Sequence, residues 1–169
     1  GKFLVYKKED KIIFKKIKKE LGLPFFVKPA NMGSSVGVSK VRNEKEFKEA
    51  IKTAFDYDLK ILIEENIPGR EIECAILGNE NPIASVAGEV HLKTDFYSYD
   101  AKYIDENGAI IEIPAKLSKK TLKKIQELSI KTFKTLSCEG LGRVDCFLNK
   151  RGQIFVNEIN TIPGFTSIS

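Results

Sequence analysis

The sequence predicts an α+β fold, and three features of its 169 residues support this class. Segments with apolar residues at helical spacing are interspersed with short, mostly apolar runs, which indicates mixed helices and strands. Several neighbouring runs are separated only by short turns, which is typical of hairpins. The hairpins argue against a doubly wound parallel sheet, in which helices regularly connect the strands.

The first half of the chain is expected to contain two helices and four short strands. The first helix covers residues 10–21, where Ile13, Ile17 and Leu21 recur every four residues between lysines. Asn43 is a good N-cap for the second helix, and Glu46 three residues later completes a capping-box pattern. The expected strands lie at 3–6, 23–28, 36–41 and 60–64, with a small-residue loop at 30–35.

The second half is expected to contain mostly strands. Residues 92–109 are polar, aromatic and without periodicity, so they are predicted to form a long loop, which in a compact domain is usually functional. The remaining expected elements are, in order, a turn at 66–69, strands at 71–77 and 83–90, a helix from Ser118 to about Leu136, and a hairpin of strands at 141–148 and 154–159.

The net charge of +5 comes from one end of the chain. Residues 1–20 contain eight lysines and three acidic residues, whereas the rest of the chain contains 20 basic and 20 acidic residues. A solvated lysine-rich helix face explains this excess better than a nucleic-acid footprint, which would form a basic stripe across the domain. We therefore expect no nucleic-acid partner.

The cysteines and the hydropathy indicate a cytoplasmic protein with no membrane partner. Cys74, Cys138 and Cys146 form no C-x-x-C pair and lie in apolar patterns, so buried free thiols are expected. The chain has no apolar run of transmembrane length and no signal-peptide pattern at its start. The single histidine, His91, argues against zinc chemistry and against histidine-dependent triads.

The last predicted hairpin places four polar side chains on one face. Residues two apart on a strand point the same way, so Arg143 shares a face with Asp145, and Glu158 with Asn160. With a two-residue loop at 151–152, Asp145 lies opposite Glu158 and Arg143 opposite Asn160. Facing carboxylates repel unless a cation lies between them, and this oxygen set suits Mg²⁺. Arg143 beside them can hold a phosphate or an oxyanion, although ordinary exposed charges are the alternative.

Three further segments are each ambiguous when they are considered alone. Residues 28–37 (KPANMGSSVG) form either an anion-binding loop or a glycine-serine turn, and they match neither a Walker A loop nor a dinucleotide fingerprint. Residues 62–71 (LIEENIPGRE) suit either a hinge that reads an adenine edge or a charged turn. Residues 96–103 (FYSYDAKY) suit either a lid over a charged substrate or a loop anchored by tyrosines.

Together and in this order, the four segments resemble the ATP-grasp fold, and specifically the D-alanine–D-alanine ligase family. Five motifs carry the resemblance along nearly the whole chain: VKPANMGSSVG, LIEExIxGRE, FYSYDAKY, GxGRVD and NEINTxPGFTS. The resemblance implies two mixed α+β subdomains, at 1–68 and 69–169, with nucleotide bound between them. It also implies joining of two D-alanines through an acyl phosphate, for peptidoglycan synthesis, by an enzyme that is a homodimer when full length.

The resemblance implies a role for each matching residue. The groups implied to bind ATP are Lys28 (adenine and α-phosphate), Glu64 (adenine amino group), the backbone of Glu65 and Ile67 (adenine ring), Glu71 (ribose), Ser34 and Ser35 (terminal phosphates) and Lys102 (transferring phosphoryl group). The implied ligands of two Mg²⁺ ions, or of Mn²⁺, are Asp145, Glu158 and Asn160. The groups implied to act on the substrate are Arg143 with the backbone N–H of Gly164 (oxyanion hole), Ser169 (carboxylate of the second D-alanine), and Tyr103 with Ser34 (substrate orientation).

Two alternatives to this function stay open. One is another ATP-grasp carboxylate–amine ligase, including a D-alanine–D-lactate ligase. The other is a basic, non-catalytic binding module that uses the lysines of residues 1–20. The family's N-terminal domain has no counterpart in the sequence, so these 169 residues alone are expected to have little or no ligase activity.

Overall fold

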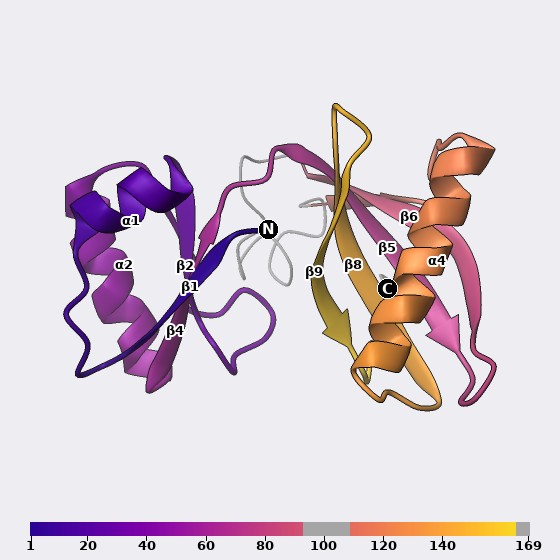
Figure 1. Ribbon diagram of the computed structural model, residues 1–169, viewed down its shortest axis with the longest axis horizontal. Helices are drawn as coiled ribbons and strands as arrows, with labels where there is room; N and C mark the ends of the chain where they lie inside the picture. Colours follow the sequence, from indigo (N-terminus) through magenta and orange to yellow (C-terminus); the bar gives the residue numbers. More distant parts are fainter. Residues whose placement is uncertain (93–108, 165–169) are drawn as a thin grey trace. The chain divides into compact units, whose positions relative to one another are not determined.

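The computed structural model describes residues 1–92 and 109–164, which divide between two compact units. The first unit contains Gly1–Ile67, and the second contains Pro68–His91 and residues 110–164. Each unit has its own sheet (Figure 1) and its own hydrophobic core. Within the described ranges, no helix is long and apolar enough to cross a membrane.

The first unit is a four-stranded antiparallel sheet with two helices on one face (Figure 1). The strands, in spatial order, are β1 (Phe3–Lys7), β4 (Lys60–Glu65), β2 (Phe25–Pro29) and β3 (Ser39–Val41). Phe25, Val27, Ile61 and Ile63 are fully buried against α1 (Phe14–Leu21) and α2 (Glu44–Tyr57). Because strand side chains alternate, Lys28 and its neighbours across the strands lie on the opposite face.

The second unit is a five-stranded sheet with one helix packed on it. The strands, in spatial order, are β7 (Ala109–Glu112), β6 (Ile83–Leu92), β5 (Gly69–Leu77), β8 (Leu141–Asn149) and β9 (Ile154–Asn160). Helix α4 (Lys119–Thr135) contributes Ile125 and Phe133 to a core that includes Ile72, Val144 and Cys146 of the sheet. The polar residues that alternate with these core positions lie on the other face of the sheet.

Most predicted elements are confirmed, but three in the first unit begin later than predicted. The strand predicted at 23–28 covers Phe25–Pro29. The first helix begins at Phe14 because the Asp10 carboxylate accepts a hydrogen bond from the Lys7 N–H at 2.7 Å, which closes a turn instead. The strand predicted at 36–41 is reduced to Ser39–Val41. Gly37, at φ 71°, adopts the left-handed backbone conformation, which cannot continue a strand.

The second unit contains one strand that the sequence analysis missed. Strand β7 covers only Ala109–Glu112 and lies at the edge of the sheet. Four residues are too few to show a periodicity. The strand forms because these residues pair with β6, which is its only neighbour among the described strands.

The prediction of free thiols is confirmed, although one thiol is only partly buried. Cys74 and Cys146 are buried and Cys138 is partly buried, and all three are free. Burial raises the pKa of the Cys146 thiol to about 12, so this thiol stays protonated at neutral pH.

Replacing Asn43 by alanine is expected to destabilise the first unit by about 1 kcal/mol. The Asn43 side chain accepts the N–H of Glu46 at 3.0 Å, and the Glu46 carboxylate accepts the N–H of Arg42 at 2.8 Å. The loss is measured by urea unfolding with far-UV circular dichroism. Lys45→Ala, at an exposed position in the same turn, is the control, and equal losses in both variants would contradict the assigned cap.

Candidate functional site

The hairpin of β8 and β9 pairs the four predicted residues as expected. Asp145 lies opposite Glu158, and Arg143 lies opposite Asn160. The predicted two-residue loop is wrong, because Asn149 pairs with Gln153 across a three-residue turn. A bulge between Asp145 and Cys146 restores the predicted pairs further along the hairpin. All four side chains therefore start from one face of the sheet.

Arg143 and Asp145 form the centre of this face. Arg143 Nε and Nη2 donate to the two carboxylate oxygens of Asp145 at 2.7 and 2.8 Å. Asn160 Nδ2 also donates to Asp145, at 3.0 Å. The hydrogen bond to Asp145 raises the pKa of the Arg143 guanidinium further above its ordinary value, so the group remains a cation. The cluster therefore combines a fixed positive charge with a fixed carboxylate.

Glu73 is a member of this cluster that the sequence analysis missed. It lies on β5 directly opposite Asp145, and its carboxylate is 3.5 Å from Arg143 Nη2. The alternation with Glu71 two residues earlier could have indicated it, because both must point to the same face of the strand. Glu71, the predicted ribose ligand, lies on this face as well, since Glu71 pairs with Phe147 and Glu73 with Asp145.

The donor set on this face fits a hard divalent cation. Asp145, Glu158 and Asn160 offer two carboxylates and an amide oxygen from adjacent strands, which is the ligand chemistry that Mg²⁺ prefers. The Asp145 carboxylate is held by Arg143 and Asn160, and bound cations commonly share ligating carboxylates with such outer partners. Arg143 Nη1 is not used in these contacts, which leaves donors of the guanidinium fork for an anion.

In the first unit, two predicted nucleotide residues contact each other. Lys28 Nζ on β2 is 2.9 Å from Glu64 Oε1 on β4, on the face of the sheet away from the helices. Both side chains are partly exposed, at 20% and 28%. The neighbouring Glu65 uses its side chain to accept the Lys2 N–H at 2.6 Å, and its own N–H donates to the Lys2 carbonyl.

The predicted phosphate loop contains an unusual turn. Ser34 and Ser35 both have positive φ values, 55° and 60°, which non-glycine residues rarely adopt. The Val36 N–H donates to the Gly33 carbonyl at 3.1 Å and closes the turn around them. Such backbone strain is concentrated at functional sites, which supports the anion-binding interpretation over an ordinary turn.

The structure describes only some of the remaining predicted residues. Ile67 follows β4 at the end of the first unit, and Gly164 is an exposed residue just after β9. Lys102, Tyr103 and Ser169 lie outside the described residues.

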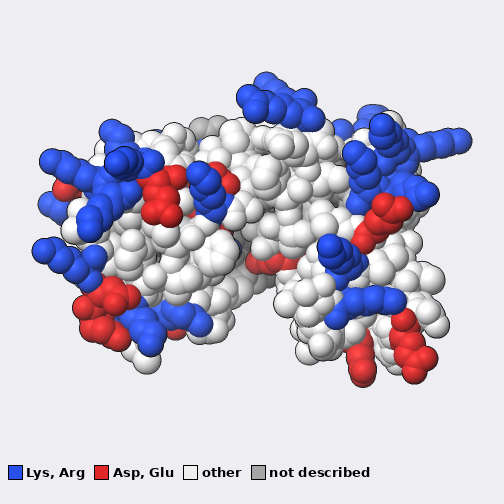
Figure 2. Space-filling model, in the orientation of Figure 1, with Lys and Arg blue, Asp and Glu red and all other residues white. Residues whose placement is uncertain are grey.

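The lysine-rich segment at residues 1–20 belongs to the first unit. On the face of the molecule in Figure 2, Lys and Arg side chains over the first unit are intermingled with Asp and Glu side chains. An electrostatic nucleic-acid site needs a basic patch or stripe. The mixed charges on this face give the binding-module alternative no support.

The whole chain is similar in sequence to one family of enzymes. A family model described as "D-ala D-ala ligase C-terminus" matches residues 4–169. A protein named D-alanine--D-alanine ligase from Oceanobacillus iheyensis is 59% identical over 100% of this chain and 47% of its own length. D-alanine--D-alanine ligase A of Escherichia coli K12 is 52% identical over 94% of this chain and 43% of its own length. The chain thus spans about half the length of the curated relatives it matches.

Solved structures agree with the sequence comparisons. The VanG D-Ala:D-Ser ligase from Enterococcus faecalis has a TM-score of 0.88 and 38% identity, and the match covers 99% of this chain and 49% of that one. The D-alanine--D-alanine ligase from Bacillus anthracis has a TM-score of 0.80 and 32% identity, with 98% and 52% covered.

Proposed function

The chain belongs to the family of D-alanine–D-alanine ligase C-terminal regions, and from this membership we propose that the whole protein joins two D-alanines with ATP, for peptidoglycan synthesis. One structural observation supports the proposal in addition to membership of the family. The face formed by β5, β8 and β9 brings a fixed arginine next to an oxygen-rich donor set. A ligase that passes through an acyl phosphate needs both groups at the reacting atoms.

In the first proposed step, a carboxylate oxygen of one D-alanine attacks the γ-phosphorus of ATP, and ADP leaves. The side chains of Asp145, Glu158 and Asn160 would hold two Mg²⁺ ions, or Mn²⁺, which would supply positive charge to offset that on the phosphate oxygens. Lys102 would neutralise the transferring phosphoryl group, and the loop of Ser34 and Ser35 would cover the terminal phosphates.

In the second proposed step, the amine of the other D-alanine attacks the acyl carbon and inorganic phosphate leaves. Charge then develops on the former carboxyl oxygen, where Arg143 and the N–H of Gly164 would donate hydrogen bonds. Ser169 would hold the carboxylate of the attacking D-alanine, while Ser34 and Tyr103 would orient the substrates. The two contacts between Arg143 and Asp145 support this role, because they fix the guanidinium in advance.

The nucleotide part of the proposal rests on residues in and next to β2, β4 and β5. Lys28 would bind the adenine and the α-phosphate, and Glu64 would accept the adenine amino group. Their ion pair supports this, because it keeps two complementary groups side by side on one face of a sheet. Backbone groups of Glu65 and Ile67 would read the adenine ring, and Glu71 would hold the ribose hydroxyls.

The wider organisation is also a proposal. We infer that residues 1–68 and 69–169 are the two ATP-grasp subdomains, which the separate sheets and cores of the two units support. The relatives have about twice the length of this chain, so activity is proposed for the whole protein and not for these 169 residues alone. An ATP-consuming enzyme with free thiols suits the cytoplasm, and the full-length protein is proposed to be a homodimer.

Glu158→Gln in the full-length protein is expected to lower D-alanine-dependent phosphate release by at least about 100-fold, because even outer-shell partners of a metal are worth 10–100-fold. The substitution keeps the size of the side chain but removes the charge that faces Asp145. Binding of Mg²⁺–ATP, measured by calorimetry, should weaken in parallel. The exposed Glu139→Gln is the control, and turnover that survives Glu158→Gln would show that the metal assignment is wrong.

The acceptor is tested in the same assay. The similarity to a D-Ala:D-Ser ligase makes D-serine the specific second candidate, and D-lactate tests the depsipeptide alternative. We expect D-alanine alone to support phosphate release, because it then supplies both substrates. We expect added D-serine or D-lactate to increase this release little. Release with D-alanine plus D-serine or D-lactate, but not with D-alanine alone, would reassign the second substrate while leaving the ATP chemistry intact.

A further inference from the structure

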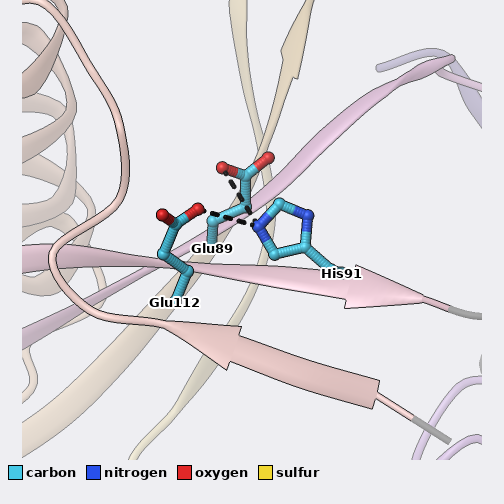
Figure 3. A group of neighbouring side chains, drawn as sticks. All are labelled: Glu89, His91 and Glu112. Carbon is cyan, nitrogen blue, oxygen red and sulfur yellow. Dashed lines mark hydrogen bonds and ion pairs between the residues drawn. The ribbon is translucent and has the colours of Figure 1, made fainter.

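Three metal-ligating side chains meet in the second unit (Figure 3). Glu89 and His91 are two apart on β6, and Glu112 comes from the neighbouring edge strand β7. His91 Nε2 is 3.1 Å from Glu112 Oε2 and 3.7 Å from Glu89 Oε2. One donor atom from each residue lies within 4.8 Å of the other two.

These distances suit one small cation between the three groups. Zinc binds imidazole nitrogen and carboxylate oxygen at about 2.0–2.1 Å, so two ligands at tetrahedral angles are roughly 3.3 Å apart. The separations of 3.1 and 3.7 Å from His91 Nε2 bracket that value. A cation could therefore replace the hydrogen bond between His91 and Glu112 with small side-chain movements.

The protein around the three residues fixes one ligand and leaves another accessible. The Glu89 side chain is only 7% exposed, and Arg70 donates to both of its carboxylate oxygens. Arg70 is itself anchored on the Lys116 carbonyl at 3.0 Å. Such outer partners orient the ligands of metal sites. The His91 side chain is 47% exposed, which gives an ion a path to the group.

Besides Arg70, which holds Glu89, a second cation contacts the group, and this one is weakly held. Lys116 Nζ is 2.6 Å from Glu112 Oε1, and its side chain is 84% exposed. An exposed ion pair between residues four apart contributes little stability, so this lysine can move into solvent. Glu112 meanwhile directs its other oxygen, Oε2, toward His91.

The three residues lie on the opposite face of the sheet from the proposed magnesium ligands. Glu89 pairs with Ile72, and Ile72 pairs with Cys146, so the side chains of Glu89, Ile72 and Cys146 lie on the face that α4 covers. Asp145 precedes Cys146 on the same strand and therefore points to the other side. An ion bound at Glu89 would not be the ion held at Asp145.

We propose that Glu89, His91 and Glu112 form a second cation site, which takes a divalent transition-metal ion such as Zn²⁺ and cross-links β6 to β7. The imidazole nitrogen favours such ions over Mg²⁺, which prefers oxygen ligands alone. The proposal does not depend on the ligase activity.

The test is a titration of tag-free protein with Co²⁺ in excess Mg²⁺, followed by visible absorption and then by displacement with Zn²⁺. We expect one site, and we expect His91→Gln to weaken Co²⁺ binding by at least about tenfold, as loss of even an outer-shell partner does. Zn²⁺ should also raise the Tm of the wild type but not of His91→Gln. Circular dichroism shows whether the variant remains folded.

A second pair of variants tests the site without removing a ligand. Lys116→Met should strengthen Co²⁺ binding several-fold, because it removes the competing cation from Glu112. Lys123→Met is its matched control, since Lys123 forms a similar exposed pair with Glu127 four residues away on α4. Unchanged affinity in both His91→Gln and Lys116→Met, or loss of the signal in Asp145→Asn alone, would overturn the proposal.

Discussion

Replacing Arg143 by methionine is expected to lower kcat of the full-length protein by about 10²–10³-fold, the usual effect of removing one oxyanion donor. Methionine keeps much of the arginine side chain's length but removes its charge and its five donors. It also leaves Asp145 without the two hydrogen bonds that hold its carboxylate. The measurement is steady-state phosphate release at saturating ATP and D-alanine.

Arg151→Met is the matched control for this prediction. Arg151 lies in the turn of the same hairpin and is exposed, so its loss should leave kcat unchanged. Binding of Mg²⁺–ATP by Arg143→Met separates a role as oxyanion donor from a role in nucleotide binding. An oxyanion donor affects kcat more than it affects nucleotide affinity. Wild-type kcat in Arg143→Met would refute the assigned role, whatever the nucleotide affinity.

Replacing Phe25 by alanine is expected to cost the first unit about 3–5 kcal/mol of stability, the range for large aromatic truncations in cores. Phe25 is fully buried, and its ring centroid lies 6.1 Å from that of Phe14 and 5.9 Å from that of Phe47. The ring joins β2 to both helices, so its removal leaves a cavity that rigid neighbours cannot fill. The free energy of unfolding in urea measures the loss.

Phe3→Ala is the control for the core prediction. Phe3 is 60% exposed on β1, and substitutions at such positions usually change stability by no more than about 0.5 kcal/mol. Similar losses in the two variants would mean that Phe25 does not hold the core of the first unit together.

The hairpin of β8 and β9 shows how a correct strand pairing can come from an incorrect turn. Alternation on the strands predicted the faces of Arg143 and Glu158, and the pairing of Asp145 with Glu158 is confirmed. The predicted loop was one residue too short, and the bulge compensates for the extra residue. Side-chain alternation is a local property, whereas a bulge depends on how two strands pack together.

The boundaries that were wrong share a similar cause. The turn closed by Asp10 replaced the first helical turn, and the left-handed residues around Gly37 replaced half of a strand. Both outcomes depend on specific hydrogen bonds and backbone angles that apolar periodicity does not report. The helices with clear caps, at Asn43 and Ser118, begin where the sequence predicted.

The sequence by itself determined the α+β class, the main helices and strands, and the polar face of the last hairpin, because each depends on local spacing and capping. The ordered motifs also identified the family. Only the tertiary structure decided that Glu73 joins Arg143 and that Glu112 meets Glu89 and His91. These contacts depend on which strands become neighbours in the sheet, and strand pairing between distant segments is not encoded in any local pattern.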